Sequence, residues 1–387
     1  MNVTVIYGGK SGEHEVSLVS AASVARNIDK KHKITLIAIT KTGKWFLQPE
    51  TELERIRNDE KSHFEIIEDT KNEVFAIPGG GKERAFVVNG CEIPCDVVFP
   101  VLHGTFGEDG TIQGLFEMIG VPYVGCSPLG SAITMDKEKT KAVLANAGIP
   151  VVPGICVRRS DLADWKKYDE ILENAQKQLG FPMFVKPCSA GSSDGANLAV
   201  DLRHLNSAII DAFNWDDKIL IEKAVNAREI ECSVTGNPTI CDGQKSFEVL
   251  TAYGPGEIAP KHDFYDYDAK YNDPDGAELL IPARLEDDKL EEIRNLAKKA
   301  FAVLDLCGLS RVDFFMDKDS SEIYLNEINT MPGFTQISMF PKMCAKFGLD
   351  FTALTELLMD EALSKFEAAS SDTSKELASS FILSITE

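Results

Sequence analysis

Residues 311–329 read RVDFFMDKDSSEIYLNEIN, a sequence typical of a β-hairpin. A turn centred near residue 320 places Asp313 opposite Glu327 and Arg311 opposite Asn329. Because side chains alternate between the two faces of a strand, we expect all four to project from the same side. Neighbouring carboxylates repel each other unless a cation lies between them, and an all-oxygen set with an amide suits Mg²⁺ better than zinc. The alternatives are a solvated face with incidental charge, or a pairing shifted by one residue.

The composition is that of an ordinary globular protein, with 387 residues, 44% hydrophobic and 26% charged. This length allows two or three domains. The net charge of -21 argues against nucleic acid as a partner, because phosphate backbones bind basic surfaces. No apolar run approaches a membrane span and the start lacks a signal peptide, so we expect a cytoplasmic protein without membrane association. The nine scattered cysteines, none in a Cys-x-x-Cys pair, indicate reduced thiols.

Strand and helix patterns divide the chain into four predicted segments. Residues 1–130 alternate strands and helices, which is typical of a parallel α/β sheet covered on both faces, with an elaboration at residues 49–89. Two α+β units are expected over residues 131–221 and 222–360. Residues 361–387 have the pattern of a peripheral helix or a tail.

Periodicity and Gly or Pro stops predict the individual elements. The predicted strands include Val3–Tyr7, Ile34–Ile39, Val97–Leu102, Met183–Pro187 and Ala196–Val200, and the predicted helices include Ser17–Asn27, Gly110–Ile119, Lys137–Ala147, Asp164–Leu179 and Asp287–Leu304. The stretch from Tyr253 to Asp275 has little regular pattern, and its tyrosines with Lys270 predict a lid over a bound phosphate.

A loop rich in Gly and Ser, Pro187–Gly195, joins two predicted strands. Its backbone N–H groups and hydroxyls can surround phosphate oxygens, and Lys186 on the preceding strand can meet a phosphate as a point charge. The loop is not a Walker A sequence, and an ordinary hairpin loop is the alternative. Farther along, Glu222 suits the edge of an adenine and Glu229 suits a ribose. The alternative is that both belong to a charged connector.

Two loops of the first segment follow predicted strands, where ligands of parallel sheets bind. In GGKSGEHEVS, residues 8–17, Glu13 suits an ammonium group, and the alternative is a charge at the start of a helix. In LHGTFGEDG, residues 102–110, His103 lies between a strand end and three glycines. This position makes His103 a better site candidate than an isolated histidine.

Seven motifs, in order along the chain, resemble the D-alanine–D-alanine ligase family of the ATP-grasp superfamily. They are the two loops just described, Met135-Asp136-Lys137, Lys-Pro with Gly-Ser-Ser, YDYDAKY at 265–271, Arg311-Val312-Asp313, and NEINTMPGFT at 326–335. The resemblance extends from Val3 to about Leu358. It implies an ATP-grasp fold, in which a parallel-sheet domain precedes two α+β domains that clamp ATP.

The resemblance also implies a role for each matched residue, with ATP as co-substrate and two Mg²⁺ or Mn²⁺ ions as cofactors. The implied ATP contacts are Lys137, Lys186, Ser193, Glu222, Glu229 and Lys270, and the implied metal ligands are Asp313, Glu327 and Asn329. The implied catalytic residues are Glu13, Ser192, Tyr271, Arg311 and Gly333, with His103, Ser338 and Met339 at the substrates.

By the mechanism of the family, one D-alanine carboxylate attacks the γ-phosphate and becomes an acylphosphate. The amine of a second D-alanine then attacks its carbonyl and expels phosphate. The product serves peptidoglycan precursor synthesis, and no covalent enzyme intermediate is expected. Dimers are common in the family, so a homodimer is expected.

The second substrate is the weaker inference. Tyr271 and the apolar Met339 favour D-alanine, and D-serine or D-lactate are the alternatives. Asp194 and Ala190 depart from the usual motif, and an anion at position 194 is expected to weaken nucleotide binding. A non-catalytic nucleotide-binding homologue is a further alternative, but it predicts missing metal ligands or a missing lid lysine, and all of these are present.

Overall fold

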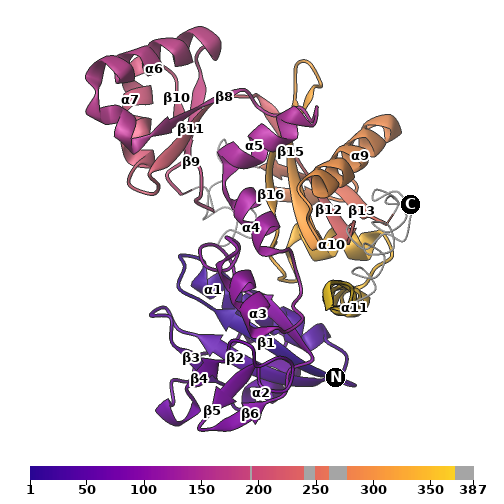
Figure 1. Ribbon diagram of the computed structural model, residues 1–387. Coiled ribbons are helices and arrows are strands. Elements are labelled where there is room, and N and C mark those ends of the chain that lie inside the picture. Colours follow the sequence, from indigo (N-terminus) through magenta and orange to yellow (C-terminus); the bar gives the residue numbers. More distant parts are fainter. Residues whose placement is uncertain (192–193, 239–248, 261–276, 371–387) are drawn as a thin grey trace, which may run out of the picture.

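The computed structural model describes residues 1–191, 194–238, 249–260 and 277–370, which form an N-terminal, a central and a C-terminal unit (Figure 1). The strands are β1 (Asn2–Gly8), β2 (Lys33–Ile39), β3 (Trp45–Leu47), β4 (Val74–Ala76), β5 (Phe86–Val88), β6 (Cys91–Ile93), β7 (Val97–Val101), β8 (Gly154–Arg158), β9 (Met183–Pro187), β10 (Asn197–Ala199), β11 (Lys218–Lys223), β12 (Ala227–Gly236), β13 (Thr251–Pro260), β14 (Ala277–Leu280), β15 (Gly308–Asp317) and β16 (Ile323–Asn329). The helices are α1 (His14–Asn27), α2 (Glu50–Asn58), α3 (Thr111–Ile119), α4 (Pro128–Met135), α5 (Lys137–Asn146), α6 (Trp165–Gln178), α7 (Leu202–Ala212), α9 (Asp287–Val303), α10 (Met339–Lys346) and α11 (Phe351–Ser370).

The N-terminal unit is built on the sheet β3-β2-β1-β7, in which β1 pairs in parallel with β2 and β7. The predicted parallel pairing is therefore confirmed for β1, β2 and β7, while the edge strand β3 pairs antiparallel with β2. The apolar run of β1 is buried on both faces: Val5 and Tyr7 pack with α1 and α11, while Ile6 packs with α3 and the small β4-β5-β6 sheet. The loops that follow β1 and β7 consequently lie together at one edge of the sheet.

The central and C-terminal units carry antiparallel sheets, ordered β10-β9-β11-β8 and β14-β13-β12-β15-β16. Helices α6 and α7 cover the central sheet, and α4 and α5 lie where the three units meet (Figure 1). In the C-terminal sheet, Val312 and Phe314 pack against Ile293 and Ala297 of α9. Because strand side chains alternate, this burial turns Arg311 and its neighbours to the opposite face.

Two predicted segments differ from the structure. The chain from Tyr253 was expected to be irregular, but β13 runs to Pro260 and pairs with β12 and β14. Cross-strand hydrogen bonds outweigh the Gly and Pro residues that break the local pattern. The remainder of the predicted lid, residues 261–275, lies outside the described residues. Helix α11 runs without a break across the predicted boundary at 360/361.

No helix within the described ranges is long and apolar enough to cross a membrane.

We predict that replacing Phe64 with alanine lowers the free energy of unfolding by about 3–5 kcal/mol, because the cavity left behind cannot fill. Phe64 is 0% exposed and stacks on Tyr7 with the ring centroids 4.6 Å apart. Phe75 is 57% exposed, so Phe75→Ala is the matched control and should change stability by less than about 0.5 kcal/mol. Urea denaturation measures both, and equal losses would contradict the packing described.

Candidate active site

The hairpin of β15 and β16 has the predicted register. Asp313 pairs with Glu327 and Arg311 pairs with Asn329. The register then shifts by one residue between Asp313 and Phe314, so that Asn326 is the additional residue on β16. The bulge occurs beyond the four polar positions and leaves them on neighbouring strands.

Arg311 is held between two carboxylates on this face. It donates to Asp313 from Nε at 2.7 Å and from Nη2 at 2.6 Å, and its Nε lies 3.3 Å from Glu231 on β12. Burial alone would lower the pKa of Arg311, but the charges of Asp313 and Glu231 outweigh burial and raise it well above its usual value. Arg311 therefore keeps its positive charge in this partly buried position.

Lys137 connects the hairpin to the Gly/Ser loop. Its Nζ donates to the carbonyl of Ala190 in the loop at 2.8 Å and lies 3.6 Å from Glu327 Oε2. Its backbone N–H donates to the carbonyl of Cys188 at 3.0 Å. A carboxylate of the C-terminal sheet and the loop of the central sheet thus share one cation from the start of α5.

A buried cluster lies beside Lys137, formed by Lys141, Lys186, Glu222 and Asn326. Glu222 Oε2 lies 2.6 Å from Lys186 Nζ, and Glu222 Oε1 forms an ion pair with Lys141. Lys186 also donates to Asn326 Oδ1 at 3.0 Å, so the cluster reaches from the central sheet to β16. Burial would raise the pKa of Glu222, but the two lysines outweigh it and lower that pKa. Burial, reinforced by Lys186 and opposed by Glu222, lowers the pKa of Lys141 to about 8.

Sequence reasoning missed two members of this cluster. Lys141 follows Lys137 by four residues, one turn of α5, and this spacing was the available signal. Asn326 joins the cluster because of the bulge in β16, and no local sequence pattern predicts that bulge.

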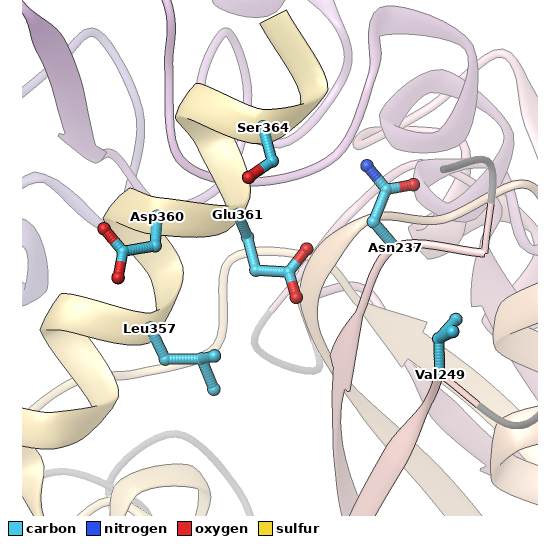
Figure 2. Close-up of a pocket in the computed structure, with 6 residues that line it drawn as sticks. All are labelled: Asn237, Val249, Leu357, Asp360, Glu361 and Ser364. Atoms are coloured by element: carbon cyan, nitrogen blue, oxygen red, sulfur yellow. The ribbon is translucent and has the colours of Figure 1, made fainter. Parts of the chain in front are cut away.

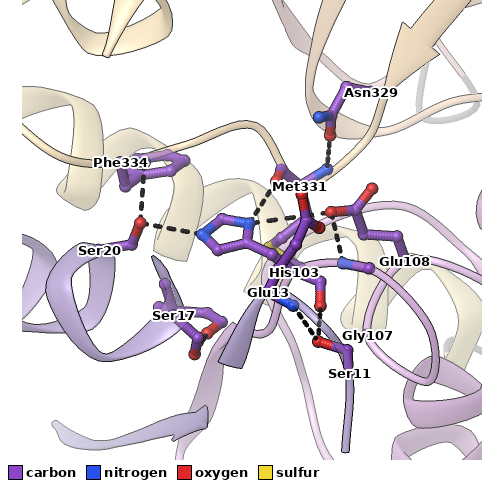
Figure 3. Close-up of polar contacts among 12 residues, drawn as sticks. Ser11, Glu13, Ser17, Ser20, His103, Gly107, Glu108, Asn329, Met331 and Phe334 are labelled. Atoms are coloured by element: carbon purple, nitrogen blue, oxygen red, sulfur yellow. Dashed lines mark hydrogen bonds and ion pairs between the residues drawn. The ribbon is translucent and has the colours of Figure 1, made fainter. Parts of the chain in front are cut away.

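Glu13 lies where the N-terminal unit meets the Gly/Ser loop. A Cβ on Gly104 would lie 3.0 Å from Glu13 Oε2, and one on Gly191 would lie 3.6 Å from the same atom. The Glu13 N–H donates to Ser11 Oγ at 3.2 Å, and that hydroxyl donates to the carbonyl of His103 at 2.7 Å (Figure 3). The two N-terminal loops are therefore tied to each other beside the loop of the central unit.

His103 is buried, with 4% of its surface exposed. Its Nδ1 lies 2.9 Å from the carbonyl of Met331 and its Nε2 lies 2.9 Å from Ser20 Oγ (Figure 3). Burial alone would lower the pKa of His103, but Glu108, 3.8 Å away, outweighs it and raises that pKa. The imidazole ring of His103 therefore connects α1 to the segment after β16. A contact between His103 and a substrate stays a prediction.

The segment after β16 places Gly333 against Ser338. A Cβ on Gly333 would lie 2.9 Å from Ser338 Oγ, which accepts from the Thr335 N–H at 3.1 Å. Met339, the first residue of α10, is 6% exposed and points toward β13, where a Cβ on Gly256 would lie 2.4 Å from its Cε. A contact of Ser338 or Met339 with substrate stays a prediction.

The other predicted site residues fall into two groups. Glu229 is partly buried in β12, where it pairs with Phe315 of β15. Ser192, Ser193, Lys270 and Tyr271 lie outside the described residues. Burial raises the pKa of Asp194, the unusual acid of the loop.

The hairpin donors fit a hard divalent cation. Asp313, Glu327 and Asn329 offer two carboxylates and one amide oxygen on adjacent strands, and their present counter-charges are Arg311 and Lys137. Oxygen-only sets of this kind suit Mg²⁺ or Mn²⁺. Across the described part of the chain, no group of three His, Cys, Asp or Glu residues that could hold a metal ion is found, and the hairpin set itself has two carboxylates with an amide as its third member.

A cavity of about 380 Å³ lies elsewhere, between α11 and the end of β12 (Figure 2). Asp360 and Glu361 line it, and burial raises the pKa of Glu361. None of the predicted site residues that the structure describes lines this cavity. It is therefore separate from the hairpin site.

Known families match nearly the whole chain. Residues 2–126 match the family described as D-ala D-ala ligase N-terminus, and residues 143–360 match the one described as D-ala D-ala ligase C-terminus. The chain belongs to the D-alanine–D-alanine ligase family. A family member from Treponema denticola, named D-alanine–D-alanine ligase, is 52% identical and covers 95% of this chain and 97% of its own. Another of the same name, from Ruminiclostridium cellulolyticum, is 43% identical and covers 94% and 96%.

Solved structures of the family have the same fold. The D-alanine-D-alanine ligase from Coxiella burnetii superposes with a TM-score of 0.79 at 30% identity, covering 100% of this chain and 99% of its own. The VanG D-Ala:D-Ser ligase from Enterococcus faecalis superposes with a TM-score of 0.78 at 34% identity, covering 93% and 99%. The predicted ATP-grasp fold is thereby confirmed.

We predict that Glu108→Gln destabilises the protein in acid more than in alkali. Glutamine keeps an oxygen that accepts from the Gly104 N–H, 2.9 Å away, but removes the charge that raises the pKa of His103. When folding raises the pKa of a histidine, the charged histidine stabilises the folded protein. This stabilisation is complete below the pKa of the unfolded chain, about 6.5, and is lost as the pH rises through the pKa of the folded state.

Urea denaturation at about pH 6 and about pH 9 measures the effect, which should be large only at the lower pH. Glu92→Gln is the control, because Glu92 is exposed and pairs with Arg84 at 3.4 Å. Equal losses for Glu108→Gln at both pH values would show that the charge on His103 is not involved.

Proposed function

We propose that the chain is an ATP-dependent D-alanine–D-alanine ligase that supplies peptidoglycan precursors. The observation that carries the proposal is that Lys137 contacts both Glu327 of the hairpin and the Gly/Ser loop. A cation at this junction suits the phosphates of a nucleotide and their metal ions. Two named ligases among the relatives, at 52% and 43% identity, support the same activity.

In this proposal ATP lies between the central unit, residues 131–221, and the C-terminal unit, residues 222–360. Lys137 and Lys186 meet the phosphates, Glu222 the adenine edge and Glu229 the ribose. Ser193 and Lys270, outside the described residues, complete the nucleotide contacts. The central sheet and the hairpin already touch through Lys186 and Asn326, 3.0 Å apart.

Asp313, Glu327 and Asn329 would hold two Mg²⁺ or Mn²⁺ ions. Such ions neutralise charge on the transferring phosphoryl group. The chain's own contribution is to orient these oxygens on paired strands and to keep Arg311 charged beside them.

The proposed chemistry has two steps. The carboxylate of the first D-alanine attacks the γ-phosphorus, ADP leaves, and D-alanyl phosphate forms. The neutral amine of the second D-alanine attacks the acyl carbon, and phosphate leaves with one of the original carboxylate oxygens. The attacking nitrogen gives one of its two protons to the departing phosphate and keeps the other, so a neutral amide forms. The acylphosphate reacts with water if it is exposed, so this sequence needs a closed site.

The remaining roles are those that the resemblance to the family implies. Glu13, beside Gly191 of the loop, holds the first ammonium group. Ser192 and Tyr271, outside the described residues, are proposed to belong to the same hydrogen-bonded group. Arg311 and the backbone N–H of Gly333 stabilise the oxyanion, and loss of one such donor costs about 3–4 kcal/mol. Ser338 receives the second carboxylate, Met339 lines that subsite, and His103 holds the loops around the first substrate.

A D-alanine–D-serine ligase is the second candidate, because VanG, a D-Ala:D-Ser ligase, superposes with a TM-score of 0.78. A D-alanine–D-lactate ligase is a third. We also propose a cytoplasmic homodimer that uses only small-molecule substrates.

The direct test incubates the chain with ATP, Mg²⁺ and D-alanine carrying ¹⁸O in its carboxylate, and follows products by mass spectrometry. We expect D-alanyl-D-alanine, with one ¹⁸O transferred to phosphate for each dipeptide formed. EDTA should abolish turnover and added Mg²⁺ should restore it. Faster turnover with D-serine or D-lactate as second substrate would replace the assignment, and absence of ¹⁸O in the phosphate would exclude the acylphosphate.

We predict that Glu327→Gln lowers kcat by about a hundredfold or more, the loss that follows removal of one preorganised charge-stabilising group. The control is Glu322→Gln on the same hairpin, because Glu322 is exposed and its carboxylate accepts from the Tyr324 hydroxyl at 2.5 Å. Steady-state kinetics at saturating ATP compares the two variants. Equal activity of both would remove Glu327 from the metal site.

A further inference from the structure

Glu222 is shared between two lysines in the buried cluster. One carboxylate oxygen pairs with Lys141 and the other lies 2.6 Å from Lys186. The exposed fractions of the three side chains are 7% for Lys141, 10% for Lys186 and 3% for Glu222. The three groups therefore carry two positive charges and one negative charge in a place with little water.

We propose that Lys141 is a positioning residue for nucleotide binding, which keeps Glu222 paired so that Lys186 is free to turn to a phosphate. This inference rests on the proposed use of ATP. Lys141 acts through Glu222 and Lys186 and does not itself touch the nucleotide.

The physical reason is the cost of a buried charge without a partner. When Lys186 turns to a phosphate, Glu222 loses one of its two ion pairs. Lys141 remains on the other oxygen, so the carboxylate stays compensated. Without Lys141, departure of Lys186 would leave the Glu222 charge buried and unpaired, and Lys186 would stay with Glu222 instead.

The arrangement of α5 supports different tasks for Lys137 and Lys141. Lys137 begins the helix and reaches the loop carbonyl of Ala190 at 2.8 Å. One turn later, Lys141 is directed to Glu222 on β11. The first lysine faces the proposed phosphate site, and the second supports the side chains behind it.

The same helix offers a matched control. Lys139 is 55% exposed and pairs with Glu138 at 3.1 Å. Lys139→Met removes one positive charge from α5, as Lys141→Met does, without touching the cluster. A difference between the two variants therefore reports the Glu222 contact rather than the net charge of the helix.

The experiment measures the dissociation constant of Mg·ATP by calorimetry without D-alanine, and then KM for ATP and kcat. We expect Lys141→Met to raise both the dissociation constant and KM by about tenfold or more, with kcat at saturating ATP changed by less than about threefold. Lys139→Met should match the unchanged chain, and Lys141→Arg should restore most of the affinity.

A pH profile gives a second readout. The groups that face Lys141 are Glu222 on β11, Lys186 on β9 and Glu327 on β16, and burial is the main cause of its pKa near 8. Since nucleotide binding favours charged Lys141 in this scheme, ATP affinity of the unchanged chain should fall as the pH rises through about 8. Lys141→Met should lack this component of the profile.

A double-variant cycle separates positioning from a structural role. In a Glu222→Gln background no buried charge competes for Lys186, so the added Lys141→Met change should cost far less ATP affinity than it does alone. Melting temperatures without nucleotide check folding, and if Lys141→Met does not fold, Lys141→Gln takes its place in every comparison.

Three results would overturn the inference: unchanged ATP affinity in Lys141→Met, an equal loss in Lys139→Met, or a full additional loss in the Glu222→Gln background. These outcomes are independent of ligation. A chain that binds ATP but makes no dipeptide would contradict the proposed function while leaving the binding comparison intact.

Discussion

The register in which β15 pairs with β16 from Arg311 to Asp313 is the constraint on which the rest of the site depends. It sets Asp313 beside Glu327 and Arg311 beside Asn329, while Val312 and Phe314 are buried under α9. A shift by one residue would exchange the two faces, moving the charged residues into the core. Burial of the apolar face therefore fixes the polar face, and with it the oxygen atoms available to a metal ion.

Charge compensation joins the three units around this hairpin. Lys137 bonds the central loop and approaches Glu327, Lys186 connects Glu222 to Asn326, and the Gly/Ser loop closes on Glu13. Each of these contacts uses a charged side chain, and nucleotide phosphates with their cations are the ligands that can exchange with such partners. The junction is held by these contacts, and its charged groups are ones that can change partners on binding.

The sequence was sufficient for features governed by local pattern. The hairpin register followed from alternation and turn residues, and the parallel sheet followed from the apolar runs of β1 and β7. The remaining features depend on tertiary contacts, which a local sequence pattern does not contain. β13 forms through pairing with β12 and β14 despite Gly254, Pro255 and Gly256, and Lys141 becomes part of the site only because β11 places Glu222 against α5.

The most direct test of the account is to locate the metal ions. Crystals grown with Mn²⁺ and a non-hydrolysable ATP analogue would show the ions by anomalous scattering. The account predicts two peaks within about 2.6 Å of oxygen atoms of Asp313, Glu327 and Asn329, beside the phosphates under the Gly/Ser loop. Peaks held by other residues, or a nucleotide bound away from this hairpin, would contradict it.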